Sequence, residues 1–471
     1  MIVNREIKMT MSSNINMSVR DFRALKYADI AIDGITLVAG ENGCGKSTLS
    51  KLLYYSVNNI SNYDSLVRKN LYRDMRDVAQ LFEIMLRDLP EESEDESINR
   101  RSYINEIPNL VRNINDVDTP LKILEDRWIL LLREVKKIYS DSAIDFSGEI
   151  LGLDSSIPIS KRIRVSRMNR ILKVVLQDDI DDVNLEGNSD YNEVTHETDP
   201  FNKIEKFIFS KFEIASQAID NRPISLIEKE LSKIFSESDL PTEFCIKEFG
   251  ETILSRSIQS TSLLFSINDA IYIDNPMMFA VESSDNPHWN DLKSLLHGSG
   301  NTSNEISNLI STEIISGDVE SVDENYIVND FKFKRSDNAI FNLLDMATGI
   351  KSFSILQLLI KNGHLNDKTL LIIDEPESNL HPQWVVEYAR VIVLLHKKFK
   401  VNLFLASHNP DMVSAIRYIS EKEGVLDRVN FYLAEKDDGK FDYKYKWLRH
   451  DIEPIFESFN IAIDRIDRYG V

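Results

Sequence analysis

The sequence has only two cysteines, Cys44 and Cys245, among its 471 residues. Two thiols cannot build a disulfide framework, which fits a reducing compartment. No apolar run approaches the roughly 18 residues that a membrane-spanning helix needs, so we expect no contact with a membrane. The N-terminal sequence MIVNREIKMTMSSN lacks the apolar stretch and the cleavage site of a secretory signal. These absences predict a cytoplasmic protein.

Basic residues are also fewer than acidic residues. The chain carries 55 Lys and Arg against 76 Asp and Glu, a formal net charge of −21. Proteins that bind nucleic acid through non-specific phosphate contacts usually have a basic surplus, because Lys and Arg make those contacts. The acidic total therefore argues against a general DNA clamp, although it leaves room for a local basic groove.

The order of hydrophobic patterns predicts an α/β protein with an insertion. Strand patterns occupy residues 15–39 and return near Phe244, and helix and strand then alternate to about residue 408. Between them, apolar residues recur at helical spacing from Val67 to Leu89, from Leu121 to Ile138 and from Phe201 to Ile219. None of these helices sustains heptads, so a long coiled-coil arm is not expected. We predict an α/β part in residues 1–60, a helical lobe in 61–240 and the rest of the α/β part in 241–471.

Residues 40–47 read GENGCGKS and match the phosphate-loop pattern G-x-x-x-x-G-K-[ST] at every fixed position. Glycines let the backbone wrap around phosphate oxygens, and the lysine and serine of the pattern contact the β and γ phosphates and Mg²⁺. A chance glycine turn at a helix start is the competing interpretation, but an apolar strand precedes the loop and a helix follows it. We expect nucleotide binding by Gly40, Asn42, Gly43, Cys44, Gly45, Lys46, Ser47 and Thr48.

A second candidate site is the acidic end of the strand at residues 370–373. This continuous apolar run ends in Asp374 and Glu375, and buried strands rarely end in two carboxylates unless a partner compensates them. Beside a phosphate loop, Asp374 is expected to hold Mg²⁺ together with Ser47, and Glu375 to act as general base on water. Solvated acids at an exposed strand end are the alternative.

His408 follows the next strand, Val401 to Ala406. The carboxyl ends of neighbouring parallel strands meet at one sheet edge, where open α/β sheets bind ligands. We therefore interpret His408 as a γ-phosphate sensor and count it with Lys46 and Glu375 as catalytic, although a lone histidine is more often structural.

The segments GENGCGKS, LLIIDEPESNLHP and LASHNP resemble the Walker A motif, the Walker B motif with its D-loop, and the H-loop of ABC/SMC-type ATPases of the AAA family. The motif IIDEPE-x-NLHP is similar to that of the bacterial OLD-like ATPases, including ATPase subunits of anti-phage systems such as Septu, PARIS and some retrons. The resemblance covers about residues 14–60 and 244–450. It implies a P-loop NTPase fold of the ABC/SMC head type, a mixed central sheet flanked by helices, with an inserted all-helical lobe.

The resemblance also implies a signature segment ahead of Walker B. Residues 346–352 (MATGIKS) occupy that place and depart from the LSGGQ form, with Thr348 at the serine and Lys351 at the glutamine. In such ATPases this segment reaches the nucleotide of the opposite subunit, so Thr348 and Gly349 imply a homodimer or a higher homo-oligomer that encloses ATP. A plain helix N-cap by Thr348 would give much the same local sequence.

Three weaker candidates remain open. Asp274 has the place of a Q-loop residue, and Phe22 and Arg23 could approach the nucleotide base. An acid-free basic stretch in residues 161–173 fits either a phosphate or acidic-protein contact, or a helix whose charges are balanced by the acids at 178–182. Its basic residues are Lys161, Arg162, Arg164, Arg167, Arg170 and Lys173.

We derive three functional hypotheses. The first is an ATP- and Mg²⁺-dependent ATPase subunit of a bacterial anti-phage complex that holds, activates or releases an effector such as a nuclease or toxin on another chain. The residues after His408 are too few for a catalytic nuclease domain of ~100 residues, so none is expected in this sequence. The alternative is an SMC-like repair or chromosome-maintenance ATPase that binds DNA directly; DNA binding is possible but not required. A transporter ATPase fits the altered signature least.

Overall fold

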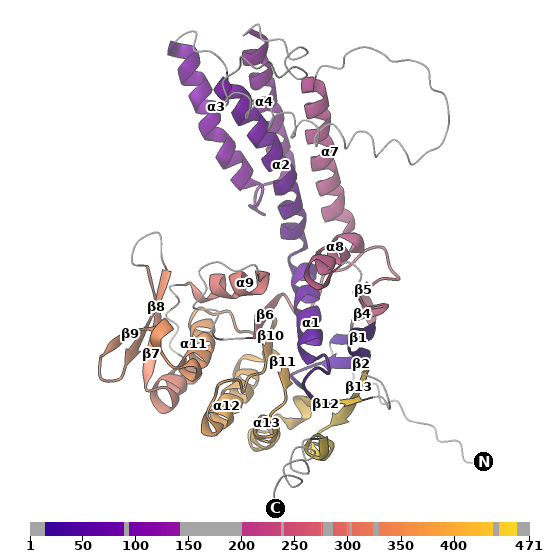
Figure 1. The fold of residues 1–471 in the computed structure, drawn as a ribbon, viewed down its shortest axis with the longest axis vertical. Helices are drawn as coiled ribbons and strands as arrows, with labels where there is room; N and C mark the ends of the chain where they lie inside the picture. The colour runs from indigo at the N-terminus through magenta and orange to yellow at the C-terminus, as the bar shows by residue number, and fades with distance from the viewer. Residues whose placement is uncertain are drawn as a thin grey trace, which may run out of the picture. The chain divides into compact units, whose positions relative to one another are not determined.

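The computed structural model describes residues 15–88, 94–141, 200–236, 240–274, 276, 286–298, 300, 304–323, 329–436 and 442–458. The chain divides into a head unit, Met1–Ser61 with Pro223–Val471, and a helical unit, Asn62–Arg222 (Figure 1). Residues 223–240, which we assigned to the helical lobe from sequence, group with the head unit. The physical reason is that helix α8 (Ile224–Phe235) packs against α1 (Lys46–Ser61).

The head unit is built on a mixed sheet. Its described strands follow the order β5-β4-β1-β2-β13-β12-β3-β11-β10-β6. Their bounds are β1 Ile15–Phe22, β2 Leu25–Ile32, β3 Ile35–Ala39, β4 Glu243–Glu248, β5 Glu251–Ser255, β6 Asp269–Ile273, β10 Thr369–Asp374, β11 Asn402–Ser407, β12 Val429–Lys436 and β13 Tyr443–Arg449.

Strand direction separates this sheet into two parts. The neighbours β12, β3, β11, β10 and β6 are all parallel, whereas β1, β2, β4 and β5 pair antiparallel. Every residue of β3 and β10 is buried, which explains their mostly apolar sequences, because helices cover both faces of a parallel sheet. The mixed α/β P-loop NTPase fold predicted from the sequence is confirmed.

Helices cover the two faces of the parallel strands. On one face, Leu371 and Ile373 of β10 belong to a cluster of buried apolar side chains. This cluster also includes residues of the helices α11 (Thr348–Lys361), α12 (Pro382–Phe399) and α13 (Pro410–Lys422). Helix α1 contacts β6, β10 and β11, and Tyr54 on α1 stacks on Tyr272 of β6. In Figure 1, α12 and α13 lie side by side next to β11.

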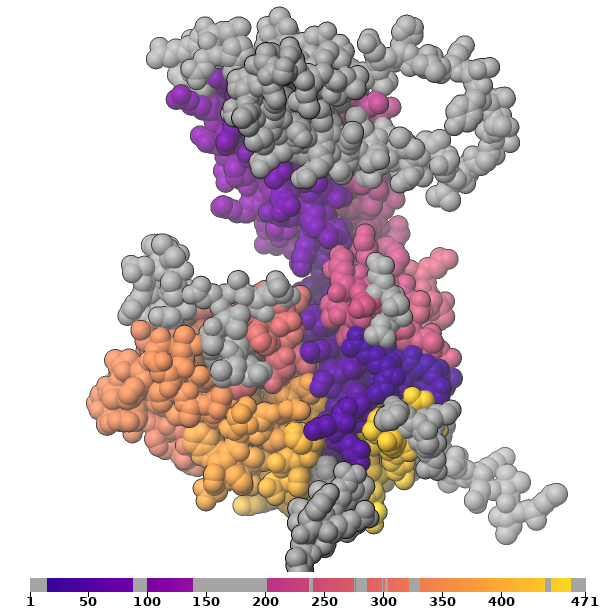
Figure 2. Space-filling model, in the orientation of Figure 1, coloured from indigo at the N-terminus to yellow at the C-terminus, as the bar shows by residue number. Residues whose placement is uncertain are grey.

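A smaller three-stranded sheet completes the head unit, in the order β7 (Gly317–Asp323), β8 (Asn329–Arg335) and β9 (Ile340–Asn342). The remaining short elements are α9 Pro287–Leu296, α10 Glu305–Leu309, η3 Ile310–Ile314, η4 Leu343–Asp345 and η5 Leu426–Arg428. In Figure 2 the indigo N-terminal segment and the orange-to-yellow C-terminal segment adjoin on the surface of this unit, although the helical unit separates them in sequence.

The helical unit contains α2 (Tyr63–Asp88), α3 (Glu94–Asn113), α4 (Leu121–Asp141) and α7 (Pro200–Asn221). Helix α3 was not among the helices expected from the sequence, and it contains Pro108, a residue type that disfavours helix interiors. Its packing on α2 and α4 outweighs that local preference. The basic stretch 161–173 lies outside the described residues. Within the described ranges, no helix is both long and apolar enough to cross a bilayer.

Candidate nucleotide-binding site

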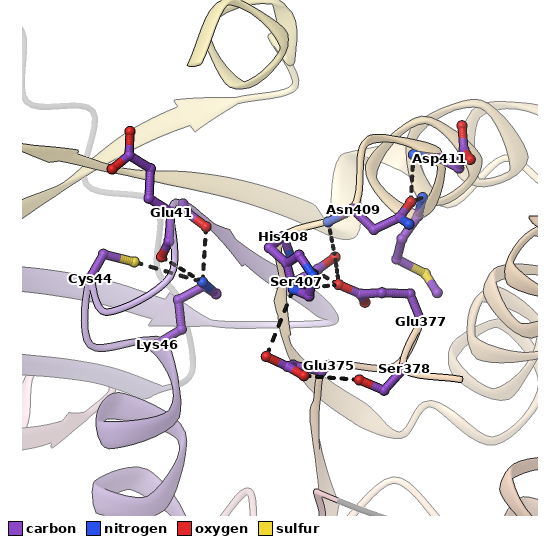
Figure 3. A network of polar contacts seen from close by, with 12 residues as sticks. Glu41, Cys44, Lys46, Glu375, Glu377, Ser378, Ser407, His408, Asn409 and Asp411 are labelled. Atoms are coloured by element: carbon purple, nitrogen blue, oxygen red, sulfur yellow. Dashed lines mark hydrogen bonds and ion pairs between the residues drawn. The ribbon is translucent and has the colours of Figure 1, made fainter. Parts of the chain in front are cut away.

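Three chain segments leave the main sheet at the same edge. The register pairs Ala39 of β3 with Ser407 of β11, and Asp374 of β10 with Ala406. The loop after β3, the acids after β10 and His408 after β11 therefore start at neighbouring strand ends, where parallel α/β sheets bind ligands. Figure 3 shows the loop with Lys46 next to the strand ends that carry Glu375 and His408.

The glycines of the loop at residues 40–45 meet two different requirements. Gly43 and Gly45 have φ angles of 83° and 93°, a region that side chains rarely adopt. A Cβ at Gly45 would lie 2.9 Å from Leu25 Cδ2, and a Cβ at Gly40 would lie 2.8 Å from Ala434 Cβ. Helix α1 begins directly after this loop, at Lys46. The loop thus places a helix N-terminus, with its free N–H groups, at the edge of the sheet.

The Lys46 side chain lies along this loop. Its Nζ donates to the carbonyl oxygens of Gly40 at 2.9 Å and Glu41 at 3.0 Å, and it lies 3.8 Å from Cys44 Sγ (Figure 3). The residue is only 6% exposed. The loop therefore holds one positive charge among backbone dipoles at the place where we expected phosphate.

Cys44 points into the protein. Its side chain is fully buried, and its Sγ lies 3.8 Å from the hydroxyl of Tyr445, which donates to the Cys44 carbonyl oxygen at 3.3 Å. Burial raises the pKa of Tyr445 well above its usual value, so this hydroxyl stays protonated. Of the other expected loop residues, Asn42, Gly43 and Ser47 are exposed and Thr48 is half-buried. Cys44 can contribute only its backbone to a ligand.

Asp374 is a buried carboxylate that meets the phosphate-loop helix. Burial raises its pKa, while interactions with the hydroxyls of Ser47 and Tyr272 act in the opposite direction. The Tyr272 hydroxyl donates to Oδ2 at 3.2 Å, and the buried Oδ1 has no hydrogen-bond partner. Helix α1, which begins with Lys46 and Ser47, contacts β10, so the start of this helix and the acidic strand end are neighbours although they are far apart in sequence.

This arrangement fits a magnesium ion that shares its ligands with phosphate. Mg²⁺ is usually held by one or two protein oxygens together with substrate phosphates and water. Ser47 and Asp374 supply such oxygens, and the unpartnered Oδ1 of Asp374 is the kind of buried acceptor that a cation would satisfy. No group of three or more His, Cys, Asp or Glu side chains able to hold a metal occurs among the described residues, so a cage made of protein alone is not present there.

Glu375 adopts a left-handed conformation with φ at 53°. Its backbone N–H donates to the carbonyl oxygen of Ala406 at 2.8 Å, which fixes the turn out of β10. Its side chain is 43% exposed, and its Oε2 accepts from the Ser378 hydroxyl at 2.9 Å. The carboxylate is accessible to water and oriented by a neighbour, as a general base requires.

His408 lies between two carboxylates. Its Nδ1 is 3.2 Å from Glu377 Oε1 and 3.8 Å from Glu375 Oε1. Glu377 is buried and accepts from the Ser407 hydroxyl and the His408 backbone N–H, both at 2.9 Å (Figure 3). Burial raises the pKa of Glu377, partly offset by these donors. Glu377 therefore anchors the end of β11 that carries His408.

A family profile described as "AAA ATPase domain" matches residues 15–413, most of the chain. The chain belongs to this family. Membership implies that the protein binds and hydrolyses ATP. No curated protein matches the sequence significantly.

Solved structures similar to this AAA ATPase domain include SMC heads and an ABC protein. The Smc head domain of Pyrococcus furiosus bound to the C-terminal domain of ScpA has 10% identity and a TM-score of 0.31, covering 95% of this chain and 98% of that one. The SMC head domain of Thermotoga maritima has 12% identity and a TM-score of 0.27, covering 48% and 85%. The protein cbiO1 of Clostridium perfringens, part of the ABC transporter complex cbiONQ, has 12% identity and a TM-score of 0.24, covering 51% and 82%. These likenesses concern the fold alone.

In this AAA ATPase, Thr348 and Gly349 lie in the first turn of α11. The N-cap is Ala347 and makes no side-chain capping bond, so Thr348 is not the capping residue that the alternative interpretation required. A Cβ at Gly349 would lie 2.6 Å from the Trp384 ring and 3.2 Å from Leu380 Cδ2. The glycine thus allows close packing of α11 on Trp384. The other expected site residues cluster instead at the strand ends: Lys46, Asp374, Glu375 and His408.

The weaker candidates have structural partners. Asp274 accepts from Trp289 Nε1 at 2.8 Å and lies 3.0 Å from His288 Nε2. Burial alone would raise the pKa of Asp274, but these neighbours outweigh it and the pKa is lowered. Phe22 is 1% exposed, and the Arg23 guanidinium lies over the Phe22 and Phe235 rings and donates to the Phe235 carbonyl oxygen at 2.9 Å. The enclosed Phe22 ring therefore offers no open face to a nucleotide base.

Two residues that the structure adds to the site, Tyr272 and Glu377, were not found from sequence. Glu377 lies within the quoted motif LLIIDEPESNLHP, two residues after Glu375, and this second acid was the available signal. Tyr272 precedes Asp274 in an ordinary apolar strand, and nothing local distinguishes it.

Proposed function

We propose that this AAA ATPase hydrolyses ATP with Mg²⁺ at the edge of the sheet formed by β3, β10 and β11. The observation that carries the proposal is the contact of helix α1, which begins with Lys46 and Ser47, with β10, which ends in Asp374. It joins the phosphate loop to the acidic strand end, which a triphosphate–magnesium site requires.

The binding roles follow from the contacts. The backbone N–H groups of the loop at 40–45 and the start of α1 cradle the phosphates, and Lys46 exchanges its carbonyl partners for β and γ phosphate oxygens. Ser47 and Asp374 hold Mg²⁺, which supplies positive charge that neutralises the phosphates when bound.

The two remaining groups, Glu375 and His408, each have one role in the chemical step. Glu375 orients water and accepts its proton as the water oxygen attacks the γ-phosphorus and the bond to the β–γ bridging oxygen breaks. ADP leaves with the electrons of that bond, and inorganic phosphate is the second product. His408, anchored by Glu377, donates a hydrogen bond to the γ-phosphate.

Two copies of the chain enclose the nucleotide in this proposal. Thr348 and Gly349 of one copy contact the γ-phosphate bound by the other, as the position of this segment ahead of the acidic strand suggests by its resemblance to ABC/SMC-type ATPases. ATP-dependent closure of the two copies then holds, activates or releases an effector protein, such as a nuclease or toxin, in a bacterial anti-phage complex. The similarity of IIDEPE-x-NLHP to OLD-like ATPases supports this role.

Two substitutions test the ATPase site. Lys46→Ala removes the phosphate-binding charge and should abolish ATP binding in equilibrium titrations. Glu375→Gln keeps the shape but not the base, so ATP should bind while turnover falls by at least ~100-fold and closed dimers accumulate in light scattering. Glu251→Gln is the matched control, because this exposed acid lies on β5 at the far end of the sheet. Normal turnover by Glu375→Gln would exclude Glu375 as the base.

The same two variants test whether an effector protein binds. Glu375→Gln with ATP should co-purify an effector chain that Lys46→Ala does not retain. DNA-stimulated turnover with a steep salt dependence, in the absence of any protein partner, would instead support a DNA-binding ATPase.

A further inference from the structure

Tyr272 is aimed at Asp374 by the geometry of the sheet. The parallel register of β6 and β10 pairs Tyr272 with Ile372, and side chains two residues apart on a strand point to the same face. Asp374 therefore projects on the same face as Tyr272. The Tyr272 hydroxyl donates to Asp374 Oδ2 at 3.2 Å, which distinguishes the two oxygens of this carboxylate.

The two oxygens of Asp374 have different surroundings. Oδ2 has the tyrosine as donor, whereas the buried Oδ1 has no partner. A carboxyl group on a single rotatable bond can exchange its oxygens, but a donor fixed on one side holds the rotation.

Tyr272 is itself held by a buried aromatic cluster. It is 1% exposed, its ring stacks on Tyr54 at a centroid distance of 5.6 Å, and the edge-on His288 ring lies 5.0 Å away. His288 is fixed in turn by Tyr55 at 2.8 Å and Asp274 at 3.0 Å. Tyr54 and Tyr55 belong to α1, the helix that begins with Lys46 and Ser47. One rigid cluster thus fixes both the phosphate-loop helix and the donor to Asp374.

We propose that Tyr272 is a positioning residue that orients the Asp374 carboxylate so that Oδ1 faces the metal ion beside Ser47. This inference rests on the proposed function, because it assigns the cause of metal affinity at that same site. It also gives the aromatic cluster a role: Asp274, at the end of β6, supports metal binding through His288 and Tyr272.

The experiment compares two Tyr→Phe variants from the same stack. Tyr272→Phe keeps the ring and removes the hydroxyl that donates to Asp374. Tyr54→Phe is the matched control, because its hydroxyl donates to Asp291 at 2.8 Å instead. Mn²⁺ is titrated into each full-length protein with AMP-PNP, free Mn²⁺ is followed by electron paramagnetic resonance, and mant-ATP affinity is measured in EDTA.

Tyr272→Phe should weaken Mn²⁺ binding about tenfold, the usual effect of losing a hydrogen bond to a metal ligand, and leave metal-free mant-ATP affinity unchanged. Saturating Mn²⁺ should restore its ATP turnover. Tyr54→Phe should bind Mn²⁺ as the wild-type protein does.

Unchanged Mn²⁺ affinity in Tyr272→Phe, or an equal loss in Tyr54→Phe, would overturn this inference while leaving the proposed ATPase site intact. A wild-type protein that binds no Mn²⁺ with AMP-PNP would overturn both.

Discussion

Glu377 offers a sharp test of how the site is held in place, because one buried oxygen serves two donors. In Glu377→Ala the Ser407 hydroxyl and the His408 backbone N–H both lose the acceptor that lies 2.9 Å away. The side chain is 4% exposed, so water does not simply replace it. The substitution should loosen the end of β11 and displace His408.

The magnitude follows from these contacts. Leaving a buried donor unpaired costs roughly 1–3 kcal/mol, and two donors are affected here. The variant also removes a buried acid whose Oε2 has no partner, which offsets part of the loss. We expect the free energy of unfolding of the head unit to fall by about 2–4 kcal/mol.

The assay is urea denaturation followed by tryptophan fluorescence, together with hydrogen exchange over residues 402–416. Glu377→Gln is the control, because an amide oxygen still accepts from both donors, and its free energy of unfolding should stay within about 1 kcal/mol of wild type. In Glu377→Ala, ATP turnover should fall while ATP affinity, set by the phosphate loop, is retained. An equal loss of stability in both variants would refute the role of Glu377 as an acceptor.

Three further outcomes are expected. Gly349→Ala forces a Cβ to within 2.6 Å of the Trp384 ring and should cost about 1–3 kcal/mol of unfolding free energy; a smaller residue at position 384 should restore much of it, and an additive double variant would contradict the packing explanation. Burial lowers the pKa of His396 below its ordinary 6.5. Below pH 6.5 the unfolded chain therefore takes up a proton that the folded chain does not, and the free energy of unfolding falls. His396→Gln should flatten this part of the pH–stability curve. Arg68→Met leaves the carbonyl oxygens that Arg68 contacts in residues 114–119 without their donor and should increase hydrogen exchange there, with no change in the head unit.

The local sequence determined those turns, helix starts and strands that depend only on neighbouring residues. The phosphate loop was identified because close backbone approach and positive φ angles need glycine at fixed spacing, and the structure has those φ angles at Gly43 and Gly45. Proline is favoured at the first position of a helix, and α12 begins with Pro382. The continuous apolar run at residues 370–373 predicted a buried strand, and every residue of β10 is buried.

Only the tertiary structure decided which distant residues meet. The pairing of β10 with both β6 and β11 brings Tyr272 to Asp374 and Glu377 to Ser407, and no local pattern encodes such contacts. The same holds where packing outweighed local preference, as in helix α3 with its internal proline. A sequence specifies the backbone conformations that each residue tolerates, whereas the partners of a buried side chain depend on which strands the whole fold makes neighbours.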